Sequence, residues 1–151
     1  MMTATDIAED KILRMTRQFN ASPEQVYDAW TKPELLAKWW GPEGTTCPET
    51  DIDLREGGKW RTVMAHADGR HHECSGQYRL LDRPRHLVLT WSWKQEDGRQ
   101  GHETEIDIHL EPSGTGTLMT FVQKVFAETE HRDMHNQGWT SSFDCLEKIF
   151  T

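Results

Sequence analysis

The sequence has few cysteines and no motif that pairs them. Its three cysteines, Cys47, Cys74 and Cys145, are far apart and form no CxxC pair. An odd and scattered set of thiols argues against a disulfide framework and suits a reducing compartment. We therefore expect free thiols and a cytoplasmic location.

Long apolar runs are also missing. No stretch approaches the roughly 20 apolar residues that a membrane-spanning helix needs. The first residues, MMTATDIAEDK, are polar and acidic, and lack the basic and apolar regions of a secretory signal. The sequence therefore predicts neither membrane insertion nor a signal peptide.

Positive charge is in deficit. The chain has 17 Lys and Arg against 25 Asp and Glu, which gives a net charge of −8 and a pI near 5.4. Nucleic acids and anionic membrane surfaces both require a basic face. We expect no nucleic-acid partner, and solubility accounts for the acidic surface.

The chain is 151 residues long and contains no repeat, linker or low-complexity tract. This length is typical of one domain, which can bury enough surface to fold without a metal or a disulfide. We predict a disordered N-terminal tail over residues 1–10 and a single domain over residues 11–151.

The first part of that domain predicts one strand and two short helices. Residues 11–19, KILRMTRQF, alternate between polar and apolar side chains, as a half-buried strand does. Ser22 and Pro23 are typical of a helix start, and a second helix begins near Pro33. Its apolar stripe includes the adjacent Trp39 and Trp40, and Gly41-Pro42 ends it.

Residues 46–123 predict six short strands, with turn signals at Gly57-Gly58, Asp68-Gly69 and Ser113-Gly114. Residues 131–150 predict a long helix, in which Trp139 and Phe143 share one face. The order β-α-α-β6-α indicates an α+β fold. A curved antiparallel sheet wrapped around the C-terminal helix would bury both apolar faces.

Several strings in this order resemble the START-like or Bet v 1-like (SRPBCC) superfamily, and within it the Activator of Hsp90 ATPase homologue family, specifically its C-terminal domain. The strings are FNASPEQVYDAWTKPELLAKWWGP, TCPETDIDLREGGKWRTVM, CSGQYRLLDRPRHLVLTWSW, GTLMTFVQ and GWTSSFDCLEKIF. Together they cover nearly all of the chain from about residue 11 onward.

The resemblance implies a helix-grip fold with a cavity between the sheet and the C-terminal helix. It implies binding of small hydrophobic molecules, and catalysis only in some branches, such as polyketide cyclases. Eukaryotic activators of the Hsp90 ATPase carry a further N-terminal domain, for which this chain is expected to have no room. Three hypotheses follow: a binding protein, an enzyme of the cyclase or hydrolase kind, and a co-chaperone-like interaction module.

Large apolar side chains on the predicted inward faces are the candidate lining of that cavity. Aromatic rings give broad apolar contact, and methionine fills irregular space. The alternative is that they interdigitate as a solid core. With two polar residues, His72 and Tyr78, the candidate ligand-binding residues are Trp39, Trp40, Trp60, Met64, His72, Tyr78, Trp91, Trp93, Met119, Phe121, Trp139 and Phe143.

Polar candidates for catalysis or metal binding are sparse. His72 and Cys74 share one strand face opposite His66, but zinc requires a third or fourth convergent ligand, and spacing indicates no fourth. His131 and His135 have helical metal-site spacing without the accompanying glutamate, so we expect a solvated helix start. We therefore predict no metal, no cofactor and no catalytic residue, although His72 and Tyr78 are the interior groups that could transfer a proton. A homodimer is expected from base rates alone.

Overall fold

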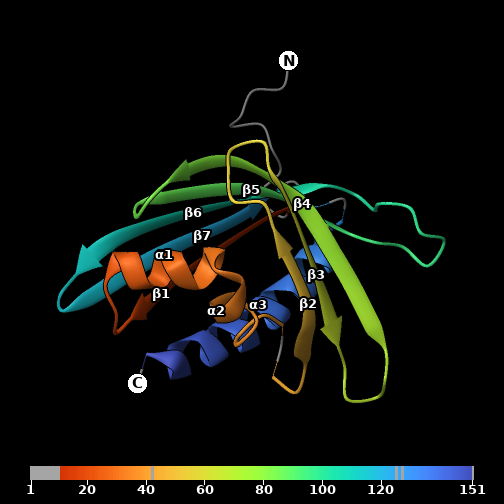
Figure 1. Cartoon of the computed structure of the whole chain (residues 1–151), viewed down its shortest axis with the longest axis horizontal. Helices are drawn as coiled ribbons and strands as arrows, with labels where there is room; N and C mark the ends of the chain where they lie inside the picture. The colour runs from red at the N-terminus through yellow and green to blue at the C-terminus, as the bar shows by residue number, and fades with distance from the viewer. Residues whose placement is uncertain (1–10, 42, 125, 127, 151) are drawn as a thin grey trace.

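The computed structural model describes residues 11–41, 43–124, 126 and 128–150, so the predicted tail over residues 1–10 lies outside that part. The order of elements follows the sequence prediction and confirms the α+β class (Figure 1). The elements are β1 (Ile12–Phe19), α1 (Pro23–Thr31), α2 (Pro33–Leu36), β2 (Thr46–Ile52), β3 (Lys59–Ala65), β4 (His71–Asp82), β5 (His86–Trp93), β6 (Thr104–Ser113), β7 (Gly116–Lys124) and α3 (Thr129–Ile149).

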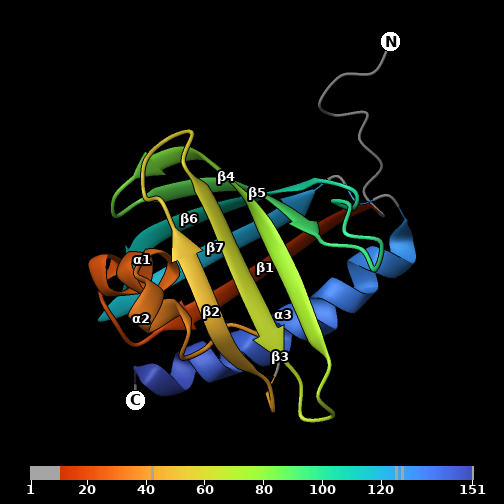
Figure 2. The same cartoon turned by 45° about the vertical axis from the view of Figure 1, so that its right-hand side comes forward.

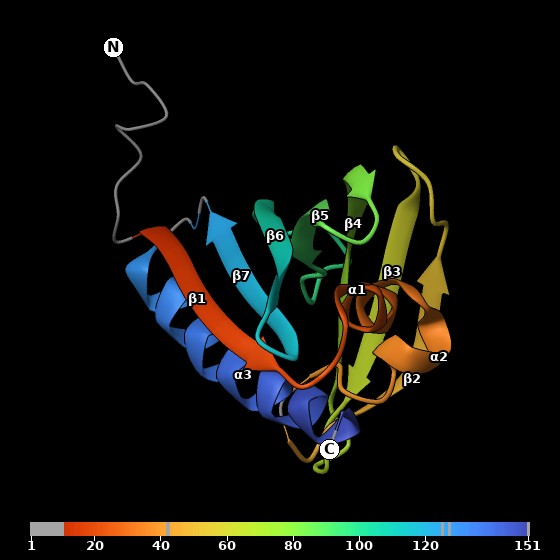
Figure 3. The same ribbon diagram turned by 90° about the vertical axis from the view of Figure 1, so that its left-hand side faces the viewer.

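All seven strands belong to one sheet, in the order β1-β7-β6-β5-β4-β3-β2, and each adjacent pair is antiparallel. The sheet is strongly curved, and its strands follow an arc from β1 to β2 in the view of Figure 3. The long helix α3 packs against β1 and runs along the sheet, as Figure 2 shows. This arrangement confirms the predicted helix-grip fold.

Local sequence signals account for the start of α1. Ser22 accepts a hydrogen bond from the Gln25 backbone N–H at 3.2 Å, and the Gln25 side chain accepts one from the Ser22 N–H at 2.9 Å. This reciprocal capping box satisfies two backbone donors that the helix itself leaves without partners. The predicted helix start at Pro23 is therefore confirmed.

The second helix is shorter than the sequence pattern predicts, because α2 ends at Leu36. The backbone N–H groups of Trp39 and Trp40 both donate to the Leu36 carbonyl, at 3.2 and 3.0 Å. One acceptor shared by two successive donors tightens the chain into a turn. Both tryptophans are consequently directed into the interior, where they are 1% and 3% exposed.

The core lies between the concave face of the sheet and α3. Ile106 and Ile108 of β6 and Phe143 of α3 are fully buried in it. The alternating carboxylates of β2 face outward, and Arg61 pairs with Glu49 and Asp51 there. Within the described ranges, no helix has both the length and the apolar character needed to cross a bilayer.

Candidate functional site

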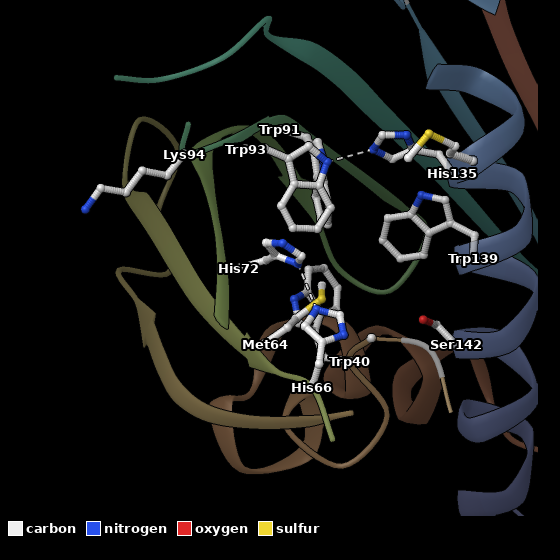
Figure 4. Close-up of a pocket in the computed structure, with 13 residues that line it drawn as sticks. Trp40, Met64, His66, His72, Trp91, Trp93, Lys94, His135, Trp139 and Ser142 are labelled. Atoms are coloured by element: carbon white, nitrogen blue, oxygen red, sulfur yellow. Dashed lines mark hydrogen bonds between the residues drawn. The ribbon is translucent and has the colours of Figure 1, made fainter. Parts of the chain in front are cut away.

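A cavity of about 430 Å³ lies between β3–β5 and α3. This volume falls within the usual range for small-molecule sites. Figure 4 shows side chains from the sheet and from α3 facing one another across it. The cavity is lined by Trp40, Gly41, Met64, His66, His72, Trp91, Trp93, Lys94, Met134, His135, Gly138, Trp139 and Ser142.

Four tryptophans form a continuous aromatic surface on this lining, which we call the indole wall: Trp40, Trp91, Trp93 and Trp139. The ring centroid of Trp91 lies 5.3 Å from that of Trp93, 5.2 Å from Trp139 and 5.4 Å from Trp40. These separations are typical of interacting aromatic pairs. The indole wall therefore gives the cavity an apolar surface of fixed shape.

Hydrogen bonds hold three of these indoles in place. Trp40 donates to the hydroxyl of Thr62 at 2.8 Å, and Trp139 donates to the side-chain oxygen of Gln123 at 2.8 Å. Gln123 in turn donates to the Thr104 hydroxyl at 2.9 Å. Because Gln123 is fully buried and both ends of its amide are bonded, it supports the wall from behind and does not face a ligand.

The third bonded indole is that of Trp93, which donates to Nε2 of His135 at 2.9 Å. Nδ1 of His135 lies 2.7 Å from the His131 carbonyl oxygen, to which it donates. These two bonds assign His135 as a neutral imidazole protonated on Nδ1. Burial lowers the pKa of His135, and this effect outweighs the opposing influence of the bond to His131.

The remaining indole of the wall, Trp91, has a buried N–H without a hydrogen-bond partner among the described residues. The same holds for Trp30, which lies behind the wall. Each ring lies edge-on to a neighbouring indole, Trp91 to Trp93 at 88° and Trp30 to Trp39 at 76°.

Polar groups gather on the other side of the cavity. Nε2 of His66, which directly follows β3, and Nδ1 of His72 of β4 are 2.8 Å apart. Lys94 follows β5, and its side chain is 47% exposed. Met134 of α3 is 67% exposed. The cavity therefore reaches the surface near Lys94 and Met134.

Six of the twelve sequence-predicted residues lie on the lining: Trp40, Met64, His72, Trp91, Trp93 and Trp139. The other six are buried in the core beside the cavity: Trp39, Trp60, Tyr78, Met119, Phe121 and Phe143. Trp39 donates to the Ala29 carbonyl at 2.9 Å, and its ring packs against Trp30 and Phe143. The adjacent tryptophans thus have different positions, since only Trp40 reaches the cavity.

Sequence reasoning did not assign the remaining lining residues to the site. Gly138 and Ser142 are small residues four positions apart, on one face of α3. His135 was expected at a solvated helix start, and that expectation is wrong, because its ring contacts Trp93 and Phe126. Its position one helical turn before Trp139 is the signal that could have placed it on the lining.

The histidines at the cavity do not form a metal cluster with the nearby cysteine. Cys74 is fully buried, its sulfur lies 3.0 Å from the Thr62 hydroxyl, and burial raises its pKa to about 12. A thiol in this state is a poor metal ligand. In the described part of the chain, the one group of three convergent ligand atoms is His86, Asp107 and His109.

That group lies on the opposite face of the sheet from the cavity. Asp107 separates the buried Ile106 and Ile108 along β6, so its side chain points away from the core. Its carboxylate oxygen lies 2.8 Å from Nε2 of His86 and 3.2 Å from Nε2 of His109. The carboxylate is thus hydrogen-bonded to His86 and in contact with His109.

Tyr78, which the sequence suggested as a proton-transfer group, is 3% exposed and does not reach the lining. Burial raises the pKa of Tyr78, and the nearby Tyr27 raises it further. A phenol that holds its proton this firmly is poorly placed for acid–base chemistry at neutral pH. The titratable groups on the lining are three histidines and Lys94.

Comparison with known proteins places these features in a family. The family model described as "Activator of Hsp90 ATPase homolog 1-like protein" matches residues 20–151. No functionally curated protein matches the chain.

Several solved structures share the fold. The AHSA1 protein from Silicibacter pomeroyi is 31% identical, with a TM-score of 0.83 over 91% of this chain and 96% of that one. A protein from Chromobacterium violaceum is 27% identical, with a TM-score of 0.84 over 93% and 97% of the two chains. A protein from Nitrosomonas europaea is 25% identical, with a TM-score of 0.79 over 95% and 96%.

Proposed function

Because the chain belongs to the Activator of Hsp90 ATPase homolog 1-like family, within the SRPBCC superfamily, we propose that it binds a small hydrophobic molecule in the cavity between the sheet and α3. The observation that carries the proposal is the indole wall, which borders a space of about 430 Å³. Burial of apolar surface there would supply most of the affinity, at about 25 cal/mol per Å².

The shape of the site supports a preformed pocket. Trp40, Trp93 and Trp139 are each held by a hydrogen bond of 2.8 to 2.9 Å. A ligand that enters such a site meets side chains that are already ordered. The entropy cost of binding is therefore small compared with that of a flexible site.

The two other hypotheses from the sequence have weaker support. An interaction module of the co-chaperone kind calls for a sizeable exposed apolar patch. Leu54 and Met134 are the large apolar residues exposed in the described part of the chain. An enzyme calls for a titrating group beside its substrate, and the histidines of the lining are the groups that an activity screen would test.

Titration with N-phenyl-1-naphthylamine tests the proposal, because this neutral dye fluoresces when it enters an apolar site. We expect saturable binding of one dye per chain. The matched variants are Gly138→Met, which adds a side chain to the lining, and Gln137→Met, which adds the same side chain to the exposed neighbouring position.

Gly138→Met is expected to weaken dye binding at least tenfold, while Gln137→Met leaves it unchanged. Replacing glycine in a helix interior also removes an unfavourable helix propensity of about 1 kcal/mol. A folded Gly138→Met variant with lost binding would therefore support an occupied cavity. Unsaturable fluorescence, or equal binding by the two variants, contradicts it.

Location and assembly complete the proposal. Cys47, Cys74 and Cys145 are free thiols, which favours a reducing compartment such as the cytoplasm. The expected homodimer remains a prediction, and a native mass measurement of the purified protein tests it together with the retention of a ligand.

A further inference from the structure

The ionisable side chains on the cavity lining are all bases. They are His66, His72, Lys94 and His135, and no Asp or Glu occurs among the described lining residues. When histidine is counted as a base in the same way, the whole chain has equal numbers, with 25 acidic residues against 17 Lys and Arg and 8 His. The lining, with four bases and no acid among its described residues, is therefore enriched in bases relative to the whole chain, which disfavours a cationic ligand and favours an anionic one.

His66 and His72 form the centre of this basic side. Their rings meet edge to face at 4.7 Å, and the ring of His72 lies 6.1 Å from that of Trp93 in the indole wall. The 2.8 Å contact between them uses one nitrogen of each ring. The second nitrogen of His72 has no hydrogen bond to any described residue, and it can donate to a ligand when the pair gains a proton.

The other ionisable groups around this pair come from the β3–β4 turn, from β3 and β4, from the end of β5 and from α3. Asp68 and Arg70 of the β3–β4 turn bond to each other at 2.7 Å, so their charges largely cancel. Lys94 follows β5, and its ammonium lies 4.0 Å from a Glu73 carboxylate that also pairs with Arg61. His135 of α3 is held neutral by Trp93 and the His131 carbonyl.

We propose that the ligand is a flat aromatic molecule with one acidic group, a carboxylate or sulfonate, whose rings lie against the indole wall and whose acidic group contacts His66 and His72. This inference rests on the proposed function and names the chemical class of the molecule bound at the same site. Lys94 lies at the surface end of the cavity, where its charge is partly balanced by Glu73, so the histidine pair is the principal contact for the acidic group.

The preference for a flat aromatic ligand follows from the indole wall. Flat rings pack against indoles in stacked or edge-to-face pairs, and such contacts add about 0.5–1.5 kcal/mol beyond burial of their area. A straight-chain acid gains no such contact and loses more rotational freedom when it binds. The wall therefore favours an aromatic acid over a fatty acid of similar size.

The pair also predicts how affinity changes with pH. Burial lowers the pKa of His72 in the free protein, and the positive influence of His66 and Arg70 lowers it further. An anion beside the pair stabilises its charged form and raises that pKa, so binding takes up a proton. Affinity for an acid consequently rises as the pH falls from about 7.5 to about 6.

Two dyes with the same ring system test this inference. N-phenyl-1-naphthylamine is neutral, and 1-anilinonaphthalene-8-sulfonate adds one sulfonate. We expect the sulfonate dye to bind on the order of fivefold more tightly at about pH 6 than at about pH 7.5, while the neutral dye changes less than about twofold. In competition, 2-naphthoate should displace the sulfonate dye more effectively than decanoate.

The variants His72→Gln and His66→Gln keep a hydrogen-bonding side chain but cannot gain a proton. They should lose the pH dependence of sulfonate-dye binding. His71→Gln is the matched control, because His71 is exposed, lies next to His72 and does not line this cavity. It should retain the pH dependence.

The outcomes separate the two proposals. If neither dye binds saturably, the proposed function fails. If the neutral dye binds but the sulfonate dye shows no pH dependence, or keeps it in His72→Gln, the acidic-ligand inference is overturned while the cavity stands. If decanoate competes as well as 2-naphthoate, the aromatic part of the inference is overturned.

Discussion

Trp93 and His135 join the sheet to the closing helix through one hydrogen bond. The Trp93 indole donates to Nε2 of His135 at 2.9 Å, and the ring centroids are 6.0 Å apart. The bond requires an unprotonated Nε2, since a protonated nitrogen cannot accept. The contact between β5 and α3 at the edge of the cavity therefore depends on the charge state of a single histidine.

This dependence predicts a loss of stability in mild acid. The pKa of His135 is lowered in the folded protein, so the unfolded chain binds more protons as the pH falls below about 6.5. The contribution is complete above that pH and is lost as the pH falls from there toward the folded pKa. His72, whose pKa is lowered too, adds to the same slope.

Denaturant unfolding between about pH 7.5 and pH 5 measures the slope. Gln in place of His135 can accept from Trp93 without titrating, so His135→Gln should flatten the slope. His109→Gln is the control, because that side chain is 57% exposed on the opposite face of the sheet. Equal slopes for wild type and His135→Gln would show that the pair does not set the acid sensitivity.

Substitutions of the adjacent Trp39 and Trp40 should differ in their effect on ligand binding while both reduce stability. Trp39→Phe and Trp40→Phe each remove one indole hydrogen bond, to the Ala29 carbonyl and to the Thr62 hydroxyl. Both should lower the free energy of unfolding by about 1–3 kcal/mol, since each removes the indole donor of a buried acceptor, although the Thr62 hydroxyl keeps its contact with Cys74. Because Trp40 alone lines the cavity, its replacement should also weaken neutral-dye binding.

The measurement is a dye titration and an unfolding curve for each variant. An equal loss of affinity in both would contradict the assignment of Trp39 to the core and Trp40 to the cavity.

Substitutions of Gln123 and Trp139 should have non-additive effects on the free energy of unfolding. Gln123→Leu removes the acceptor of the Trp139 indole and leaves that N–H buried, at a cost of about 1–3 kcal/mol. Trp139→Phe removes the donor instead. In the double variant neither group is left without a partner, so its destabilisation should be smaller than the sum of the two single effects.

Equilibrium unfolding of the four proteins in this cycle measures the coupling. If the two single effects on the free energy of unfolding are strictly additive in the double variant, the hydrogen bond between Gln123 and Trp139 does not contribute to stability. Thr104→Val serves as a comparison, because it removes the hydroxyl that accepts from Gln123 and donates to the Trp91 carbonyl while leaving the Gln123–Trp139 bond in place.

The backbone at Gly76 has no room for a side chain. A Cβ placed there would collide with the Thr90 carbonyl oxygen and lie 2.8 Å from Nε1 of Trp60, which is paired with Gly76 across β3 and β4. Gly76→Ala should destabilise the protein by about 1–3 kcal/mol. Arg79→Ala, an exposed change on the same strand, should have little effect, and a Gly76→Ala protein as stable as Arg79→Ala would contradict this packing.

Much of the fold follows from patterns in the sequence. Alternation along β5 and β6 identifies their inward residues, and the capping residue Ser22 marks the start of α1. Turn residues such as Asp68-Gly69 separate the strands. These signals are local, so a single sequence displays them directly.

The site is less predictable because it depends on position along each strand as well as on its inward face. Trp60 and Met64 share a face of β3, yet only Met64 lies on the lining. Met119 and Phe121 face inward on β7, whereas the strand lining residues belong to β3, β4 and β5. Alternation specifies a direction, but the curvature of the sheet decides where the space remains.

His135 shows the same limit from the helix side. An i, i+4 pair of histidines at the start of a polar helix is typical of a solvated surface, and His131 is indeed exposed. The partner that brings His135 to the cavity is Trp93, 42 residues earlier in the chain. Contacts at that separation have no periodic signature.

Native mass spectrometry of the protein isolated from its own host tests the central claim most directly. The wild-type chain should retain one small molecule per chain, and Gly138→Met, prepared in the same way, should carry none while Gln137→Met retains it. A wild-type protein with the bare polypeptide mass that also fails to bind the neutral dye would contradict the account.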